Sequence, residues 1–366
     1  MLKVVYLLST LEATAPVKQL FYIVKYLDRN GFEPFVVTLS PEKERSYKEL
    51  FLKEGAEVIS LERSRVEGAF LNRFLLKRIL KKLNPDIVHS QGHRANMLLS
   101  GFSEYKRVVT LRANPFKDYA FSYGKITGKF LAERELKAVL SFDRVVCVSK
   151  SLADTVYEKS GKKVEYIYNG LDFSLYEEEF DKEELRERLN LPSDKKIFSV
   201  VGNLIEGKDP KTVIEAFKLL NRNDFYLVFL GEGELLRECE RLSEGRADFR
   251  GFVKNVKDYL HASDYLISAS LSEGMPNAVL EALSCGLGVV LSDISPHKEI
   301  VGGGYFGEIF ETKNPSDLKN KILKMLNKDY EKVSYEAKRR VREDFDAKKN
   351  SFKYQKLYEE VVKGKR

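Results

Sequence analysis

Short apolar runs alternate with longer segments of helical period along most of the chain, and this alternation limits the possible folds more than any other feature. Parallel strands need a crossover connection, usually a helix, so the pattern predicts βαβ units and parallel sheets of the α/β class. Strands are expected at 4–9, 34–39, 58–61, 86–90, 107–112, 144–148 and 164–168, and then at 197–201, 225–230, 265–269, 288–292 and 307–310.

The rhythm of strands and helices stops between residues 171 and 194, where the chain turns acidic and includes the run Tyr176-Glu177-Glu178-Glu179. At roughly 150 residues per domain, a chain of 366 residues predicts two domains. We expect a Rossmann-like N-terminal domain at 1–175, a second at 190–349, and a last helix at about 350–366. Open doubly wound sheets bind ligands at their strands' carboxyl ends, so the expected site is a cleft that these ends face.

The net charge of +7 is unevenly distributed along the sequence. Residues 1–170 carry +10 and the remainder −3, and residues 71–130 alone hold 12 basic and 3 acidic side chains. Such a basic patch indicates an anionic partner, which could be a phosphate ligand, an acidic lipid surface or nucleic acid. No nucleic-acid recognition motif accompanies the patch, and the second half is slightly acidic, so no nucleic-acid partner is expected.

The three cysteines, Cys147, Cys239 and Cys285, are far apart in the sequence. This spacing argues against a disulfide framework and against a cysteine zinc site, and it is typical of a reducing cytoplasm. His89 and His93 are four residues apart, but they lie between a strand end and a helix start, so no metal pair is expected. No apolar run approaches the roughly 18 residues of a membrane span. The sequence therefore predicts a cytoplasmic protein without a bound metal.

The segment 270–286 carries the clearest chemical pattern. Pro276 suits the first turn of a helix that ends near Gly286, which leaves Glu273 on the preceding loop. Amides of that first turn would form an anion site, for example for a diphosphate. Glu281 interrupts an apolar helix, and a ribose diol would supply the hydroxyl donors that such a carboxylate needs. The alternative is that Glu281 is exposed and Glu273 only caps the helix.

A second pattern follows the strand expected at 197–201. Gly202 and Lys208 frame a loop that leads into a helix from about Pro210. Glycine allows the backbone to approach a ligand, and Lys208 can reach a diphosphate as a mobile point charge. Taken alone, Gly-x5-Lys is also compatible with an ordinary βα loop.

Together these segments resemble the family-4 retaining glycosyltransferases, which have the GT-B fold. Glu273-Gly274-Met275-Pro276-Asn277 with Glu281 is similar to the Glu-x7-Glu signature of that family, and Gly202-x5-Lys208 matches its phosphate loop. Further matches are Phe229 to Gly233, Arg250 to Val253, Ser263-Asp264, and Tyr168 to Asp172. The resemblance implies two Rossmann-like domains that face a cleft, with a C-terminal helix that crosses back to the N-terminal domain.

The resemblance also implies roles for individual residues. Lys208 would bind the donor diphosphate, Glu281 the ribose and Glu273 the donor sugar. Donor contacts would also come from the Gly202-Asn203 loop, from Val253 beside the base, and from Gly274, Met275, Pro276, Asn277, Ala278 and Val279. The implied reaction moves a sugar from a nucleotide-diphosphate sugar, such as a UDP-sugar, to an acceptor hydroxyl with retention. The nucleotide-sugar is a substrate, and neither a cofactor nor a metal is implied.

Two positions depart from the family pattern. Asn203 stands where the family usually has Arg, which removes one cation from the diphosphate site. Arg112 stands after the fifth strand, where His is common. A guanidinium can bind a carboxylate bidentately, so we hypothesise an acidic donor or acceptor sugar, such as a uronic acid. The alternative is that Arg112 pairs with a local acid or with the diphosphate.

The first loop has no adjacent glycines, and its Ala15-Pro16 with Gln19-Leu20 resembles a Gly-Pro-x-x-Gln-Leu variant of polysaccharide-building members. Ala15 would stand in for the glycine. We expect Ala15 and Gln19, together with His89 and Asn114 at other strand ends, to lie near the phosphates or the acceptor.

The segment 73–83 forms a basic amphipathic pattern, and 115–125 adds aromatic and basic residues. One interpretation is contact between 71–130 and an anionic membrane at the inner face of the cell, where a lipid-linked acceptor would reside. The other is an ordinary Rossmann helix with a solvated cationic face.

Two other functions remain open at this level. A non-catalytic GT-B partner subunit would explain the unusual Asn203 and Arg112, although Glu273, Glu281 and Lys208 favour an active enzyme. An NAD-dependent dehydrogenase would also have doubly wound domains, but no loop supplies its Gly-x-Gly-x-x-Gly fingerprint.

Overall fold

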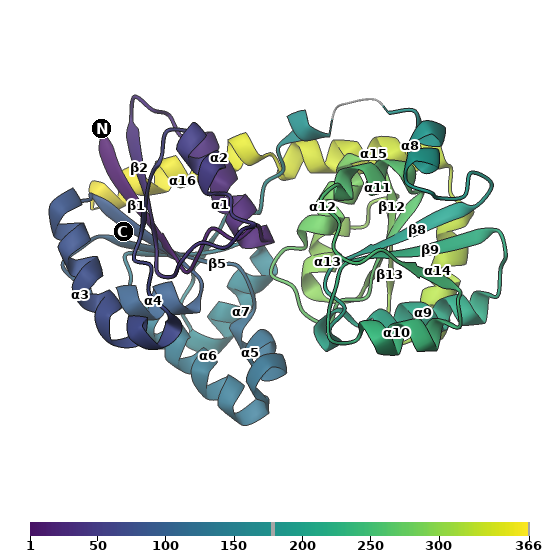
Figure 1. Ribbon diagram of the computed structural model, residues 1–366, viewed down its shortest axis with the longest axis horizontal. Coiled ribbons are helices and arrows are strands. Elements are labelled where there is room, and N and C mark those ends of the chain that lie inside the picture. The colour runs from purple at the N-terminus through teal and green to yellow at the C-terminus, as the bar shows by residue number, and fades with distance from the viewer. Residues whose placement is uncertain (177–179, 365–366) are drawn as a thin grey trace. The chain divides into compact units, whose positions relative to one another are not determined.

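The computed structural model describes residues 1–176 and 180–364, and it gives only the backbone of residues 65, 66, 69 and 70. The contacts divide the chain into two units: unit 1 is Met1–Gly170 with Ala347–Arg366, and unit 2 is Leu171–Asp346. The acidic residues 177–179 of the expected linker lie outside the described residues. Figure 1 shows that the last helix, in yellow, returns to the unit in which the chain starts, in purple.

Unit 1 is built on a sheet of seven parallel strands in the order β3-β2-β1-β4-β5-β6-β7. The order reverses between β1 and β4, so the chain adds strands first to one side of β1 and then to the other. Ligands of such sheets bind near this switch point. The strands are β1 (Leu2–Leu8), β2 (Phe32–Thr38), β3 (Glu57–Ser60), β4 (Ile87–Gln91), β5 (Arg107–Leu111), β6 (Arg144–Cys147) and β7 (Glu165–Tyr166).

The helices of unit 1 have local start and stop signals. Ser64 and Glu67 form a reciprocal capping box at the start of α3, and Gly161 ends α7 in the left-handed conformation. These helices are α1 (Ala15–Lys25), α2 (Lys48–Lys53), α3 (Arg65–Leu83), α4 (His93–Leu99), α5 (Pro115–Tyr123), α6 (Lys125–Val139), α7 (Lys150–Ser160) and α16 (Ala347–Val362).

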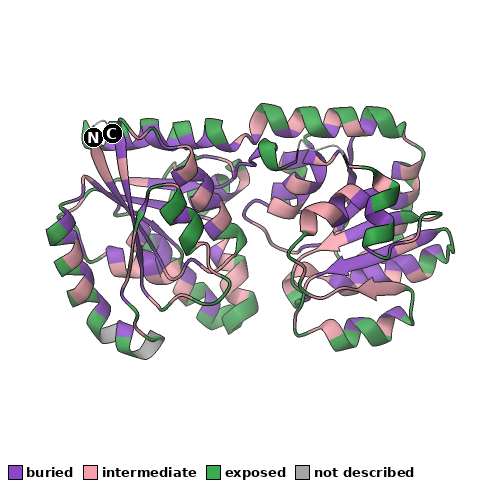
Figure 2. Ribbon diagram, turned by 45° about the horizontal axis from the view of Figure 1, so that its top comes forward, coloured by how far each residue is buried: buried purple, intermediate pink, exposed green. Residues whose placement is uncertain are grey.

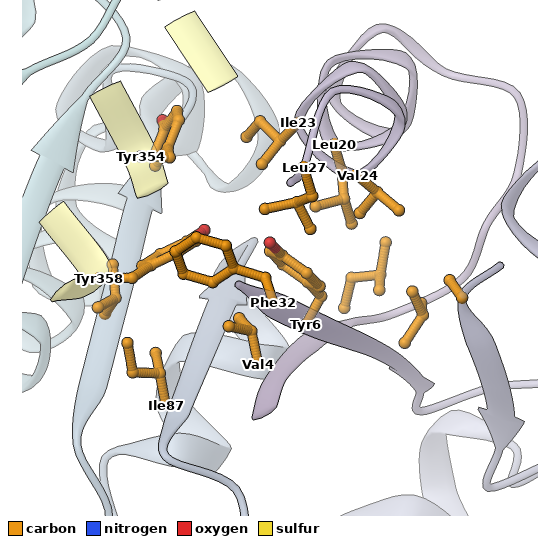
Figure 3. Packing of buried hydrophobic residues seen from close by; sticks show 14 of the residues in the cluster. Val4, Tyr6, Leu20, Ile23, Val24, Leu27, Phe32, Ile87, Tyr354 and Tyr358 are labelled. Carbon is orange, nitrogen blue, oxygen red and sulfur yellow. The ribbon is translucent and has the colours of Figure 1, made fainter. Parts of the chain in front are cut away.

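The core of unit 1 combines both ends of the chain. Tyr354 and Tyr358 of α16 are buried in the same cluster as Tyr6 of β1, and Figure 3 shows them beside side chains of α1. The Tyr6 and Tyr358 rings meet edge to face at 6.4 Å. Two further bonds fix α16 to α1: Ser351 Oγ donates to Ile23 O at 2.8 Å, and Gln355 Nε2 donates to Tyr26 O at 3.0 Å. The expected return of the C-terminal helix is therefore confirmed.

Unit 2 holds a sheet of six parallel strands in the order β10-β9-β8-β11-β12-β13, with its switch point between β8 and β11. Figure 2 shows buried strands and helices whose outward faces are exposed. The strands are β8 (Lys196–Val201), β9 (Phe225–Leu230), β10 (Ala247–Phe249), β11 (Tyr265–Ser268), β12 (Gly288–Ser292) and β13 (Gly307–Phe310). The helical elements are η1 (Phe173–Leu175), α8 (Lys182–Arg188), η2 (Glu206–Lys208), α9 (Pro210–Leu220), α10 (Leu236–Ser243), α11 (Val256–Ala262), α12 (Asn277–Ser284), α13 (Ser295–Val301), α14 (Pro315–Leu326) and α15 (Tyr330–Asp344).

An ion-pair cluster centred on Asp264 fastens α8 to the sheet of unit 2. Asp264 accepts from Arg186 Nη2 at 2.8 Å, from Lys182 Nζ at 2.7 Å and from the backbone amide of Ile197 at 2.7 Å. Burial raises the pKa of Asp264, but the two cations and the amide outweigh it, so the pKa lies below its ordinary value. The Ser263-Asp264 motif of the sequence thus has a structural role at the start of β11.

Every strand expected from the sequence is present, although some bounds shift by one or two residues. β10 was missed, because it is a three-residue edge strand with an acidic centre. In the described part of the chain no helix is long and apolar enough to cross a bilayer.

Candidate functional site

Two loops at the switch point of unit 2 bring Lys208 and Glu273 together. Lys208 ends η2 after β8, Glu273 precedes α12 after β11, and the Lys208 ammonium forms an ion pair with Glu273 Oε1. A backbone hydrogen bond from Leu271 N to Gly207 O, 2.9 Å long, ties the two loops to each other. The sequence motifs placed far apart in the chain therefore meet where a doubly wound sheet binds its ligand.

The Glu273 carboxylate is held in its ionised form. Burial raises its pKa, but the Lys208 ammonium, His297 and a 2.8 Å hydrogen bond from Ser270 Oγ bring the pKa below its usual range. The Glu273 side chain is only 15% exposed, whereas that of Lys208 is 34% exposed. The ammonium is thus within reach of both the carboxylate and an anion arriving from solvent.

Glycines allow the neighbouring loops to lie against each other. Gly202 has φ +145° and Gly231 φ +154°, and a Cβ on Gly231 would lie 2.0 Å from the carbonyl oxygen of Gly202. Leu204 N donates to Glu232 O at 2.9 Å, which pairs the two loops along their backbones. The Lys208 stem lies 3.8 Å from where a Cβ of Gly202 would be. Glycine is therefore needed at position 231, where the backbones of the two loops meet.

The helix expected after Glu273 is present as α12, with Pro276 as its N-cap residue. Pro276 makes no side-chain cap bond to this helix, and the amides of a helix's first turn have the character of an anion site. Glu281 is half-buried on α12. The pKa of the Cys285 thiol is raised to about 12, mainly by burial of the thiol and secondly by the charge of Glu281. Gly274, Met275, Pro276 and Val279 are buried, and Asn277 and Ala278 are half-buried. Their contacts with a donor stay a prediction.

The remaining donor-side residues lie on the loops around β8. Asn203 is exposed, and its carbonyl oxygen accepts from Ile205 N at 3.0 Å. Val253 packs against the buried cluster of β8, β9, α8 and α11 together with Val201. Its proposed place beside a nucleotide base is not tested by this packing.

His297 supports the Glu273 loop and was missed in the sequence. It is fully buried on α13, with Nδ1 3.0 Å from both Ser292 O and Ser292 Oγ. Ser292 Oγ in turn donates to Ser270 O at 2.6 Å. Burial lowers the pKa of His297 to about 4, so the ring is neutral at pH 7. Its contacts with Ser292 are local, but the link from Ser292 to Ser270 joins β12 to the loop after β11, which no local pattern indicates.

Arg112 lies at the end of β5 in unit 1 and contacts amide oxygens rather than acids. Its Nε donates to Gln91 Oε1 at 2.7 Å and its Nη1 donates to Asn169 Oδ1 at 2.9 Å. In residues 1–176 and 180–364 its buried Nη2 finds no hydrogen-bond partner. Burial lowers the pKa of Arg112. The alternative that a local acid pairs with Arg112 is therefore not supported.

Two of the residues expected near the phosphates or the acceptor have structural contacts instead. His89 is fully buried, with Nδ1 2.7 Å from the Tyr358 hydroxyl and Nε2 2.8 Å from Thr110 Oγ1. Burial lowers its pKa to about 3. Gln19 clamps Gly170, since its Nε2 donates to Gly170 O and its Oε1 accepts from Gly170 N, both at 2.8 Å. The expectation that His89 lies near a ligand was wrong, because both of its nitrogens are used inside the core that α16 covers. The proximity of Gln19 to a ligand stays a prediction.

The other two expected residues lie at helix starts. Asn114 caps α5, with its Oδ1 accepting from Phe116 N at 3.1 Å, and Ala15 is the exposed first residue of α1. Their proximity to a ligand stays a prediction. Among the described residues, no group of three or more His, Cys, Asp or Glu side chains could hold a metal ion.

Two family models match consecutive parts of the sequence. The model of Glycosyltransferase Family 4 matches residues 17–175, and that of Glycosyl transferases group 1 matches 181–342. Together these ranges cover most of the chain, and the boundary between them falls near the division of the two units. The chain belongs to the family-4 glycosyltransferases. The dehydrogenase alternative is left without support.

Curated relatives of this glycosyltransferase match over most of their length. The UDP-Gal:alpha-D-GlcNAc-diphosphoundecaprenol alpha-1,3-galactosyltransferase of Escherichia coli is 26% identical over 79% of this chain and 79% of its own. The N,N'-diacetylbacillosaminyl-diphospho-undecaprenol alpha-1,3-N-acetylgalactosaminyltransferase of Campylobacter jejuni is 27% identical over 93% of this chain and 94% of its own.

Solved structures show that this glycosyltransferase has the GT-B fold. The Anabaena HepE protein in complex with UDP-glucose superposes with a TM-score of 0.83 at 18% identity, and the match covers 100% of both chains. The two parallel sheets described above are the two Rossmann-like halves of that fold.

Proposed function

We propose that this glycosyltransferase moves a sugar, with retention of configuration, from a UDP-sugar to a hydroxyl group of a saccharide or lipid-linked acceptor in cell-surface polysaccharide or lipopolysaccharide synthesis. The observation that carries the proposal is the Lys208–Glu273 ion pair at the switch point of unit 2, beside the glycine-lined loop. It combines a mobile cation for a diphosphate with a fixed carboxylate for a sugar hydroxyl.

The chemistry we propose is electrostatic. As the bond between the sugar and the diphosphate breaks, negative charge grows on the leaving phosphate, and Lys208 with the first-turn amides of α12 would stabilise it. Glu281, further along α12, would hold the ribose, and Glu273 would orient the donor sugar. Arrival of the acceptor hydroxyl on the same face as the departing phosphate gives retention. The positive charges of the chain would serve where other enzymes use a metal.

The names of the relatives favour a lipid-linked acceptor. The Escherichia coli and Campylobacter jejuni proteins are both named for acceptors attached to diphospho-undecaprenol. An enzyme with such an acceptor must work at a membrane surface, which we propose is the cytoplasmic face, and the basic N-terminal half fits an anionic lipid surface.

We place the membrane contact on the α5–α6 surface of unit 1. Figure 1 shows these two helices side by side, and they bear the exposed apolar side chains Phe121, Tyr123, Ile126 and Phe130. Ile126 is 89% exposed. Lys117, Lys125 and Lys129 are exposed on the same helices. Exposed apolar groups among cations are typical of a surface that inserts into an acidic bilayer.

The helix α3 offers less for membrane contact than its sequence pattern indicated. Leu76, Leu80 and Leu83 are buried, as in an ordinary Rossmann helix, although Leu71 and Phe74 remain exposed. We therefore assign α3 a secondary part in the proposed contact.

Isothermal titration with UDP tests the donor site. We expect binding to the wild-type protein, and about 10- to 100-fold weaker binding to Lys208→Ala, since a hydrogen bond between charged groups contributes about 1.5–3 kcal/mol. Lys211→Ala is the matched control, because Lys211 is at the start of α9 and pairs with Glu238 at 2.8 Å instead. Absence of UDP binding to the wild type, or equal loss in both variants, would contradict the proposed donor site.

Liposome flotation tests the membrane contact. We expect the protein to float with phosphatidylglycerol vesicles, and to remain unbound with phosphatidylcholine vesicles. Replacing Phe121, Ile126 and Phe130 by Ser should abolish flotation, whereas Tyr335→Ser, which changes an exposed aromatic residue of α15, should not. Flotation that is unaffected by the triple change would locate the contact elsewhere.

A non-catalytic partner subunit is the second candidate function, favoured by the exposed Asn203 in place of the usual Arg. Incubation with a UDP-sugar separates the two functions. Release of UDP, either by transfer or by slow hydrolysis, supports the enzyme, while binding without any release supports the partner subunit.

Arg112 supports an acidic sugar as one of the substrates. Among the described residues its guanidinium donates to amide oxygens and not to a carboxylate, so an acidic sugar would supply a counter-charge. We expect Arg112→Ala to lower turnover more for a uronic acid substrate than for a neutral one. An equal loss for both would reject this assignment.

A further inference from the structure

A buried carboxylate in unit 1 has no part in the donor chemistry. Glu135 lies on α6, and its side chain is 4% exposed. It accepts hydrogen bonds from Asn96 Nδ2 at 2.7 Å, from the Tyr119 hydroxyl, and from His93 Nδ1 at 3.1 Å. Burial raises the pKa of Glu135, but these hydrogen bonds lower it by more than burial raises it. The pKa therefore lies below its ordinary value, and the carboxylate is ionised. Three donors from two helices, α4 and α5, thus converge on one negative charge of α6.

The Glu135 carboxylate determines which nitrogen of the His93 ring carries the hydrogen. An ionised carboxylate can only accept, so the His93 nitrogen that faces it, Nδ1, carries the hydrogen. In the neutral ring the other nitrogen, Nε2, is then a hydrogen-bond acceptor. The Tyr119 ring packs edge-on against the His93 ring, with centroids 5.3 Å apart, which holds its orientation. The His93 side chain is 37% exposed, so solutes can reach it.

The position of His93 in the fold is that of a ligand-binding residue. Gly92, with φ +88°, turns the chain sharply after β4, and α4 begins at His93. Gln91, two residues earlier, contacts Arg112 at the end of β5. His93 therefore lies at the carboxyl edge of the sheet, next to the switch point between β1 and β4.

The surroundings connect His93 with the proposed membrane surface. Tyr119 is 6.2 Å from the exposed Tyr123, measured between ring centroids, and Tyr123 belongs to the α5–α6 surface. The His93 side chain is 37% exposed and that of Glu135 only 4%, so a saccharide attached to a lipid that enters along this surface would reach His93 rather than the carboxylate.

We propose that His93, held in one tautomer by Glu135, accepts a hydrogen bond from a hydroxyl group of the acceptor saccharide. This inference rests on the proposed function of the enzyme. Glu135 and Tyr119 are positioning residues, because they act through His93. The same chemistry could serve a hydroxyl of the donor sugar, and the kinetic constants of the two substrates distinguish these sources.

Two substitutions of His93 distinguish the roles of its two ring nitrogens. In His93→Asn the amide nitrogen replaces Nδ1 and keeps the bond to Glu135, but nothing replaces Nε2. In His93→Gln the amide occupies the place of Nε2 and can still accept from a hydroxyl. The assay uses UDP-galactose and a short-chain prenyl diphosphate linked to N-acetylglucosamine, and direct titration of the second compound accompanies it.

For His93→Asn we expect the KM and the dissociation constant of the prenyl-linked probe to rise about tenfold, which corresponds to about 1.4 kcal/mol. His93→Gln should recover most of this loss, and the KM of the UDP-sugar should stay unchanged in both. Wild-type behaviour of both variants, or a rise in the donor KM alone, would overturn the proposal. No binding of the probe by the wild type would also overturn it.

Glu135→Gln provides an independent test, with Glu133→Gln as the matched control. Glu133 is two residues away on the same helix, and its side chain is 56% exposed. Glu135→Gln frees the tautomer and should raise the dissociation constant of the probe at least fivefold, whereas Glu133→Gln should have no effect. Melting temperature and UDP affinity are measured on each variant. If Glu135→Gln unfolds the protein, the comparison of His93→Asn with His93→Gln tests the proposal instead.

Failure of this inference differs from failure of the proposed function. Absence of UDP binding by the wild type refutes the donor site. The role of His93 is then tested by titration of the prenyl-linked probe alone. Normal UDP binding with an unchanged probe affinity in His93→Asn refutes the role of His93 alone.

Discussion

Gly231→Ala should destabilise unit 2 and weaken its donor site at the same time. The new Cβ would lie 2.0 Å from Gly202 O and 2.7 Å from Gly202 C, both of which are backbone atoms that no rotamer change can move. The positive φ of +154° adds strain. A left-handed conformation costs about 1–2 kcal/mol and overpacking about 1–3 kcal/mol, so we expect a loss of about 3 kcal/mol.

The control for this prediction is Gly245→Ala. Gly245 also has positive φ, +77°, but nothing lies within 4 Å of its would-be Cβ. It should show the conformational cost alone, about 1 kcal/mol. For a domain of this size about 1 kcal/mol lowers Tm by about 2–4 °C, which gives about 6–12 °C for Gly231→Ala and about 2–4 °C for the control.

Differential scanning calorimetry and UDP titration measure the two effects. Relief of the clash must shift the loop that leads to Lys208, so UDP affinity should fall about tenfold in Gly231→Ala and stay unchanged in Gly245→Ala. If both variants lose the same amount of stability and both bind UDP normally, the close packing of the two loops is not what requires glycine.

Three further predictions concern buried polar groups. Asp264→Asn should cost about 3 kcal/mol, because it leaves the buried Arg186 and the half-buried Lys182 without their carboxylate, while the exposed Asp224→Asn should not change Tm measurably. The contribution of Asp264 is present above its unfolded pKa and is lost as pH falls through its lower folded pKa, which urea unfolding below pH 5 can follow. Burial lowers the folded pKa of His297 to about 4, so the unfolded chain takes up a proton first as the pH falls. The free energy of unfolding should therefore fall by about 1.4 kcal/mol per pH unit between about pH 6.5 and pH 4. His297→Asn should reduce this slope in urea titrations. Tyr358→Phe should leave His89 Nδ1 without its partner and cost about 1–3 kcal/mol by thermal unfolding, and an unchanged Tm would show that the ring packing alone matters.

The sequence was most informative where one local pattern determines the structure. Parallel strands are buried on both faces, so they appear as apolar runs, and both sheets could be predicted from those runs. Lys208 and Glu273 were identified because each occurs in a short motif that directly follows a strand. Their contact was not predicted, since it depends on β8 and β11 being neighbours in the sheet.

The errors involve contacts between distant parts of the sequence. His89 was assigned to the ligand, but its partner Tyr358 comes from a helix that is 269 residues further along. Side chains alternate between the two faces of a strand, and nothing in the sequence tells which face α16 will cover. The pairing of His93 with Glu135 spans 42 residues and three helices, so it could be found only in the structure.

The return of α16 to unit 1 determines the order in which the two halves can mature on the ribosome. Unit 2 is one continuous stretch, Leu171–Asp346, and can complete its core as soon as it has been synthesised. Unit 1 is made first, yet its central cluster includes Tyr354, Leu357 and Tyr358. Until those residues leave the exit tunnel, the nascent first half exposes apolar surface around Tyr6, which is the kind of surface that chaperones bind. The half that starts first is therefore finished last.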